Sequence, residues 1–176
     1  MGYSLGGDIE YYQERLKTCE GRILEAAVGS GRFLIPLLET GYTVDGIDYS
    51  PEMLESCRKR CDERGLQANL YEGELQNFSL PFNYGAIIIP TGSFCLIENR
   101  ENSLDALKCF YKHLVPGGRL IVDLSLPHEL HALLIMFTRD SHRMRAKSLL
   151  LKRYENLNYR KLLSIFDNSF SLIAVI

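Results

Sequence analysis

The feature that most constrains the fold is a strand, glycine turn and helix pattern that begins at residues 23–31. Ile23 and Leu24 start an apolar run, small residues follow as far as Gly29 and Gly31, and residues 32–38 are amphipathic. This order predicts a buried strand, a tight turn and the start of a helix. Glycines in such a turn let a ligand approach the backbone where a side chain would block it. The sequence therefore predicts a ligand-binding turn directly after the first strand.

An acidic residue follows the next predicted strand, at residues 43–47. Asp48 lies at the carboxyl end of that strand, where open parallel sheets bind their ligands and where a carboxylate can hold both hydroxyls of a ribose. The glycine turn and Asp48 together indicate a nucleoside-bearing cofactor. The alternative for Asp48 taken alone is a solvent-exposed aspartate of a turn, which the sequence favours less than a ribose contact.

Strands alternate with helices through the first two thirds of the chain. Alternation of this kind predicts an α/β fold with a doubly wound, mainly parallel, Rossmann-like sheet. The expected strands cover residues 22–26, 43–47, 68–72, 86–89 and 119–123, and the expected helices cover residues 8–17, 32–39, 51–64 and 102–114.

The glycine turn narrows the choice of cofactor. A dinucleotide fingerprint has a third glycine where this chain has Leu34, so a helix start that binds a pyrophosphate is disfavoured. Residues 25–31 resemble motif I of the class I S-adenosylmethionine-dependent methyltransferases, and residues 46–54 resemble the second motif of that family. Ala27 stands where many members have the first glycine. The resemblance extends over residues 8–127.

This resemblance implies strand order 3-2-1-4-5 and transfer of a methyl group from S-adenosyl-L-methionine to an N or O nucleophile of a small molecule. Asp48 would accept hydrogen bonds from the ribose, and Glu25 would orient the amino-acid end of the cofactor. No catalytic residue is identified, and no metal is expected. The expected cofactor-binding residues are Glu25, Ala27, Gly29, Gly31, Arg32, Asp48, Tyr49, Met53, Glu74, Leu75 and Pro90.

Three of these assignments leave alternatives open. Arg32 would oppose the dipole of the helix that follows it, so it needs an anionic partner, either a carboxylate side chain or the carboxylate of the cofactor. Met53 could contact the adenine or simply fill the core. An aromatic residue near the sulfonium would gain a cation–π attraction, and Tyr12 is one of several candidates, although surface or core packing is the better explanation for each tyrosine taken alone.

The last third of the chain follows a different pattern. A helix is expected over residues 128–137 and a β-hairpin over residues 147–154 and 159–166, without the two strands that usually complete the family's sheet. The chain would then be truncated, or its tail would replace those strands. Residues 1–127 would form the cofactor-binding core, with residues 128–176 as part of the same domain or as an oligomerisation element. A bare edge on the fifth strand would favour a homodimer through residues after Pro127.

Composition limits the remaining functions. The net charge is −2 with both signs interspersed, which disfavours a nucleic-acid partner. No apolar run is long enough to span a membrane. Five scattered cysteines are typical of a cytoplasmic protein, and Cys57 and Cys61, one helical turn apart, are better explained by packing than by metal binding.

Two other functions fit the same patterns. One is a non-catalytic protein that binds S-adenosylmethionine or acts as an interaction module. The other is a nicotinamide-dependent oxidoreductase with an unusual glycine turn. A ligand stabilises the protein that binds it, so thermal melting can distinguish these functions. S-Adenosylhomocysteine should raise the melting temperature of a methyltransferase or a non-catalytic binder, and NAD(H) should raise that of an oxidoreductase.

Overall fold

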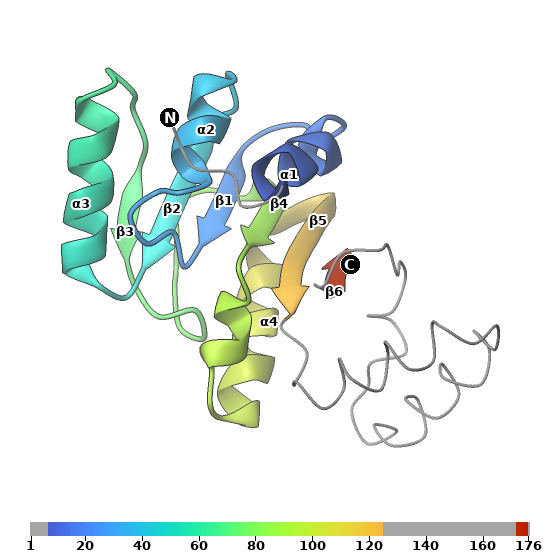
Figure 1. Cartoon of the computed structure of the whole chain (residues 1–176). Coiled ribbons are helices and arrows are strands. Elements are labelled where there is room, and N and C mark those ends of the chain that lie inside the picture. The colour runs from blue at the N-terminus through green and yellow to red at the C-terminus, as the bar shows by residue number, and fades with distance from the viewer. Residues whose placement is uncertain (1–6, 125–171, 176) are drawn as a thin grey trace, which may run out of the picture.

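The computed structural model describes residues 7–124 and 172–175. These residues form a sheet of six strands in the order β3-β2-β1-β4-β5-β6 (Figure 1), in which the first five strands are parallel and β6 is antiparallel to β5. The expected order of the first five strands is confirmed. The strands are β1 (Ile23–Ala26), β2 (Val44–Asp48), β3 (Leu70–Glu72), β4 (Tyr84–Ile89), β5 (Leu114–Leu124) and β6 (Leu172–Val175).

Helices cover both faces of the sheet, as the doubly wound pattern predicts. One core lies between the sheet and three helices, and it joins side chains of α1, α2 and α3 to Ile23, Ile88 and Ile121. The second core lies on the opposite face, where α4 packs on Leu24 and Ile87. The helices are α1 (Asp8–Leu16), α2 (Leu34–Glu39), α3 (Pro51–Asp62) and α4 (Arg100–His113), with a short 3₁₀ helix at Ser93–Leu96.

Local sequence explains how α3 begins beside β2. The Ser50 hydroxyl accepts a hydrogen bond from the Met53 backbone N–H at 3.2 Å, which satisfies one of the unpaired donors of the first turn. Pro51 occupies the first helical position, where the missing N–H of proline has no cost. The chain therefore turns directly from β2 into α3 and keeps Asp48 at the strand end.

The outer edge of β5 differs from the expectation. β6 pairs with it antiparallel from Ile121↔Val175 to Leu124↔Leu172, so the prediction of a bare edge is wrong over this part of β5. The unpaired backbone N–H and C=O groups of an open sheet edge account for the pairing, because a further strand can form hydrogen bonds with them. The expected helix at 128–137 and the hairpin at 147–166 lie outside the described residues.

The buried carboxylate of Asp45, in the amino-terminal half of β2, links several segments of the sheet by hydrogen bonds. Asp45 is buried, and its carboxylate accepts hydrogen bonds from Arg22 (2.9 Å), from the Asn69 side chain (3.0 Å) and from the Tyr84 hydroxyl (3.2 Å). Three donors satisfy the charge inside the protein. This cluster is structural and lies in the strand that ends at Asp48.

Candidate functional site

The candidate site is built around Asp48, at the carboxyl end of β2. Its side chain is only 6% exposed, so it is not a solvent-exposed turn residue. One carboxylate oxygen accepts the Gly29 backbone N–H at 2.8 Å, and the other accepts the Ser50 backbone N–H at 3.0 Å. Asp48 therefore joins the end of β2 to the glycine turn after β1.

Further hydrogen bonds hold the same turn in place. The Val28 N–H donates to the Ile47 carbonyl at 3.0 Å, and the Gly31 N–H donates back to the Val28 carbonyl at 2.9 Å. Arg60 of α3 donates to the Ser30 carbonyl at 2.7 Å and to the Ser30 hydroxyl at 3.1 Å. The turn thus has a fixed shape before any ligand is present.

The two glycines of the turn are needed for different reasons. Both have a positive φ, 53° at Gly29 and 81° at Gly31, which favours glycine. A Cβ added at Gly29 would meet no atom within 4 Å, whereas one at Gly31 would lie 2.6 Å from Cys57 Sγ and 3.2 Å from Ile35 Cδ1. The space beside Gly29 is therefore open to a ligand. At Gly31 the close packing of α3 leaves no room for a side chain.

Replacing Gly31 with alanine is expected to destabilise the protein by about 2–3 kcal/mol, because a left-handed backbone strain adds to a clash with Cys57. Urea unfolding of Gly31→Ala, Cys57→Ala and the double variant measures both contributions. Removing the Cys57 sulfur should relieve the clash, so the double variant should be about 1 kcal/mol more stable than additivity predicts. Strict additivity would contradict this packing.

Glu25 lies at the carboxyl end of β1 and is 2% exposed. Burial raises the pKa of its carboxyl group well above the ordinary value of 4.5, and the nearby Asp48 adds to this effect. The Leu34 backbone N–H and Arg32 act in the opposite direction. Its Oε2 atom has no hydrogen-bond partner among the described residues. A cation placed beside this buried carboxyl group would favour its ionised form and lower its pKa.

This raised pKa makes stability depend on pH in a defined direction. Between about 4.5 and the raised pKa, the folded protein binds a proton that the unfolded chain has lost, so Glu25 makes the free energy of unfolding fall as pH rises. Glu25→Gln removes this dependence and should be more stable than wild type at pH 8, with the difference shrinking toward pH 4.5. Urea unfolding across this range, with Glu55→Gln as an exposed control, measures it. Parallel curves for Glu25→Gln and wild type would refute the assignment.

Arg32 has an acidic side chain as its partner. Its Nη2 atom lies 2.5 Å from the Asp8 Oδ2 atom at the start of α1, so a carboxylate side chain, one of the two partners that the sequence left open, is present beside it. The guanidinium also lies over the Phe33 ring, 4.7 Å from the ring centre. The pair connects α1 to the end of the glycine turn.

The residues expected around the adenine differ in their exposure to solvent. Tyr49 is 75% exposed and Met53 is 49% exposed, so Met53 is not a core residue. Large apolar side chains in the open beside Asp48 are available to a ligand. Glu74 is exposed, Leu75 packs partly against the core under α4, and Pro90 is buried directly after β4. Ala27 adopts a φ of 58°, a conformation that glycine adopts more easily.

Sequence reasoning missed two residues of this site. Arg60 and Asp8 both contact the glycine turn or its flank, from α3 and α1 respectively. Arg60 stands 30 positions after Ser30, and no local motif marks such a contact. For Asp8, the unexplained cation at Arg32 was a usable signal.

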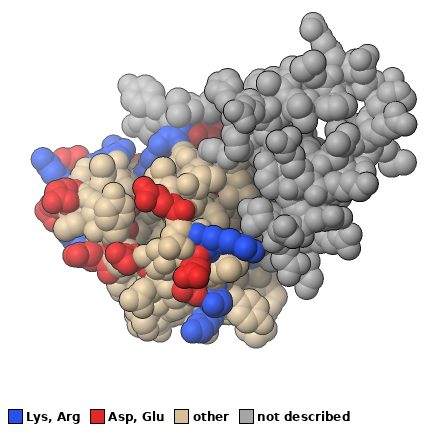
Figure 2. Space-filling model, turned by 90° about the horizontal axis from the view of Figure 1, so that it is seen from below, with Lys and Arg blue, Asp and Glu red and all other residues tan. Residues whose placement is uncertain are grey.

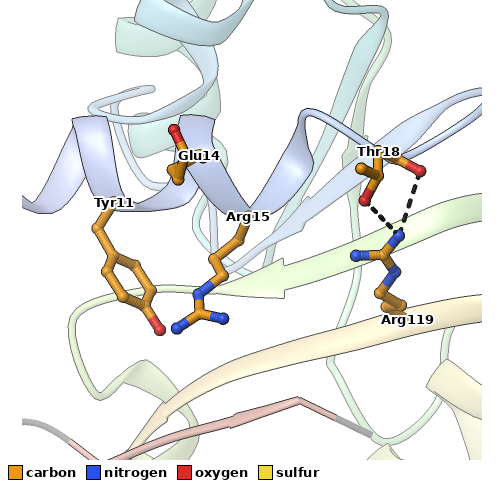
Figure 3. A pocket seen from close by; sticks show the side chains of 5 residues that line it. All are labelled: Tyr11, Glu14, Arg15, Thr18 and Arg119. Carbon is orange, nitrogen blue, oxygen red and sulfur yellow. Dashed lines mark hydrogen bonds between the residues drawn. The ribbon is translucent and has the colours of Figure 1, made fainter. Parts of the chain in front are cut away.

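The surroundings of the site carry mixed charge. Figure 2 views the molecule from the side toward which the strand arrows of Figure 1 point, and its acidic and basic side chains lie in small separate groups. A polar pocket lies elsewhere, between α1 and β5, where Arg119 binds the Thr18 carbonyl and hydroxyl at 3.2 and 2.7 Å (Figure 3). It shares no residue with the glycine turn.

Two further findings concern metals and membranes. Within residues 7–124 and 172–175, no group of three or more His, Cys, Asp or Glu side chains is placed to hold a metal ion. Cys57 and Cys61 pack in the core, and burial raises the pKa of the Cys57 thiol to about 12. In the same part of the chain, every helix is too short or too polar to cross a membrane.

An open, mainly parallel sheet, with the glycine turn after β1 and the buried Asp48 carboxylate at the end of β2, defines a Rossmann-like fold. Comparison with protein families makes this more specific. Residues 23–118 match the family described as "Methyltransferase domain". The chain belongs to this family.

Similar proteins are known by sequence and by structure. The demethylmenaquinone methyltransferase of Thermus thermophilus is 34% identical over 125 residues, 68% of this chain and 56% of the relative. The glycine/sarcosine N-methyltransferase of Halorhodospira halochloris is 35% identical over 115 residues, 64% of this chain and 43% of the relative. The crystal structure of the glycopeptide N-methyltransferase MtfA with S-adenosyl-L-methionine matches with a TM-score of 0.64 at 26% identity, covering 70% of this chain and 56% of that one. The chain spans about half the length of the curated relatives it matches.

Proposed function

We propose that the protein is an S-adenosylmethionine-dependent methyltransferase that transfers a methyl group to an N or O nucleophile of a small molecule. The observation that carries the proposal is Asp48, a buried carboxylate that holds the glycine turn after β1 and ends β2. Membership of the methyltransferase-domain family supports it and disfavours the nicotinamide-dependent alternative.

The residues present fit this cofactor at three points. The Asp48 carboxylate has about four lone-pair sites and uses two of them within the protein, so it can accept both ribose hydroxyls. The space beside Gly29 is open to a ligand. At the other end of the turn, Glu25 Oε2 is a buried acceptor without a partner among the described residues, and it suits the ammonium group of the cofactor.

The cofactor would supply an electrophilic methyl group. The protein's part is to bind and align, because alignment of two reactants alone can be worth about 7–11 kcal/mol in favourable cases. Asp48 fixes the ribose, the pinned turn fixes the backbone beside it, and Tyr49 and Met53 offer apolar surface to the base. Pro90 directly follows β4 at the same edge of the sheet, where the segment after it would face the acceptor.

A small acceptor is favoured by the names of the relatives. One of them is a glycine/sarcosine N-methyltransferase, and another, from Streptomyces venezuelae, is an N,N-dimethyltransferase of a dTDP-linked amino sugar. The mixed charge in Figure 2 offers no broad basic patch for a nucleic acid on that face. Residues 1–127 are proposed as the cofactor-binding core in the cytoplasm, and a homodimer through residues after Pro127 stays a prediction.

The experiment is titration calorimetry followed by turnover. S-Adenosylhomocysteine should bind, and NADH, as the control, should not. A panel of small amines and alcohols with S-adenosylmethionine should then yield a methylated product. Binding of S-adenosylhomocysteine without turnover would favour a non-catalytic binder, binding of NADH would favour an oxidoreductase, and binding of neither ligand would overturn the proposal.

A further inference from the structure

The pocket between α1 and β5 is lined by two arginines. It has a volume of about 380 Å³, and the residues around it are Tyr11, Glu14, Arg15, Thr18 and Arg119 (Figure 3). Both arginines are half-buried. Two cations beside one pocket repel each other, and partial burial reduces the screening of this repulsion by water. An anion bound between them would therefore lower the electrostatic energy of the pocket.

The acidic residue of the pocket does not neutralise these charges. Glu14 pairs with Lys17, which lies one turn further along the chain, and its carboxylate points away from the Arg15 guanidinium in Figure 3. Among the described residues, Arg15 forms no ion pair and no hydrogen bond, and its guanidinium lies over the Tyr11 ring, 5.0 Å from the ring centre. The N–H donors of Arg15 are therefore available to a ligand.

Arg119 is already oriented beside the pocket. Its Nη2 atom donates to the Thr18 carbonyl at 3.2 Å and to the Thr18 hydroxyl at 2.7 Å. A guanidinium has five N–H donors in one plane, so the donors on Nη1 and Nε remain for a ligand. Because Thr18 fixes the side chain on folding, little further conformational entropy is lost on binding. The planar arrangement of these donors matches the oxygens of a carboxylate or a phosphate.

The pocket is separate from the glycine turn. Arg119 lies in register with Ala86 of β4, which in turn lies in register with Ile23, the first residue of β1. The glycine turn follows Ala26, the last residue of β1, which is three residues or about 10 Å further along the strand. A ligand in the pocket would therefore occupy a different place from a cofactor at the carboxyl ends of the strands.

We propose that this pocket is a second ligand site, which binds an oxyanion group of a small molecule, either a phosphate or a carboxylate. Arg15 and Arg119 would bind its oxygens with charge-assisted hydrogen bonds, and the Tyr11 hydroxyl supplies a further donor. The chain as a whole has a net charge of −2 and does not attract anions in general, so binding depends on the two arginines. The site does not depend on the proposed function.

Nuclear magnetic resonance titration of the isotope-labelled protein with inorganic phosphate, at constant pH and ionic strength, tests this site. The Nε–H signals of Arg15 and Arg119 should shift and saturate with a Kd in the millimolar range or below, whereas the Gly29 amide signal should stay in place. Arg15→Gln should weaken binding at least about tenfold, because charge-assisted hydrogen bonds are lost. A parallel titration with acetate distinguishes the two ligand classes: saturation by phosphate, by acetate or by both identifies the oxyanion that the pocket accepts.

Arg58→Gln is the matched control. It removes the same charge from an exposed position on α3, where Arg58 pairs with Glu55, and it should leave the Kd unchanged. Arg119→Gln is a second test of the pocket and should weaken binding as Arg15→Gln does. Signals that do not saturate with either anion would overturn the proposal. An unchanged Kd in both pocket variants, or an equal loss in Arg58→Gln, would overturn it as well.

Discussion

Replacing Asp48 with alanine is expected to weaken binding of S-adenosylhomocysteine by about 1.5–3 kcal/mol, roughly a 10- to 150-fold rise in Kd. Two effects combine in this loss. The ligand loses a charged acceptor, and the Gly29 and Ser50 backbone N–H groups lose theirs. Asp48→Asn should have a smaller effect, because the amide oxygen can still accept from one of the two donors.

Titration calorimetry on folded protein gives the Kd, and circular dichroism checks that the fold is intact. Glu55→Ala is a suitable control because it removes an exposed acid from the neighbouring helix α3 without touching the turn. It should leave the Kd unchanged. An unchanged Kd for a well-folded Asp48→Ala variant would remove Asp48 from the binding site.

The largest loss of stability is expected from a glycine outside the site. Gly85, in β4, passes so close to the turn before β1 that an added Cβ would lie 1.9 Å from the Glu20 carbonyl oxygen. The contact is with backbone, which cannot rotate away as a side chain can. Gly85→Ala should therefore lower the free energy of unfolding by about 3 kcal/mol or more.

Gly65→Ala is the matched comparison. A Cβ at Gly65 would meet no atom within 4 Å, but the residue has a φ of 65°, so only backbone strain of about 1 kcal/mol is expected. Urea unfolding of both variants separates packing from backbone conformation. A cost at Gly85 no larger than that at Gly65 would mean that the turn at Glu20 does not pack on β4 as described.

Local patterns were sufficient for the parallel part of the fold. The uniformly apolar run at residues 86–89 predicts a strand covered on both faces, and β4 is such a strand. Ser50 followed by Pro51 predicts the start of α3, and the capping hydrogen bond is present. In each case the information lies within a few neighbouring residues, which is why a sequence can reveal it.

Contacts between distant residues were not predictable in the same way. In the sequence, Asp45 is simply one polar residue within an expected strand. Its hydrogen-bond partners Arg22 and Tyr84 lie 23 and 39 positions away. Arg60 lies within the helix expected over residues 51–64, and nothing in that helix pattern indicates its hydrogen bond to the Ser30 carbonyl. The pairing of β6 with β5 depends on which free edge the tail reaches. These features follow from three-dimensional packing, for which one sequence has no local signal.

The hydrogen bonds that hold the glycine turn have a consequence for the kinetics of ligand association. Val28, Gly29 and Ser30 are each held by a partner from β2 or α3, so the loop entropy is lost on folding and not on binding. Association should then be a single step without a preceding loop rearrangement. In stopped-flow experiments, the observed rate constant should rise linearly with ligand concentration and reach no plateau, and Arg60→Ala should introduce curvature by freeing the turn.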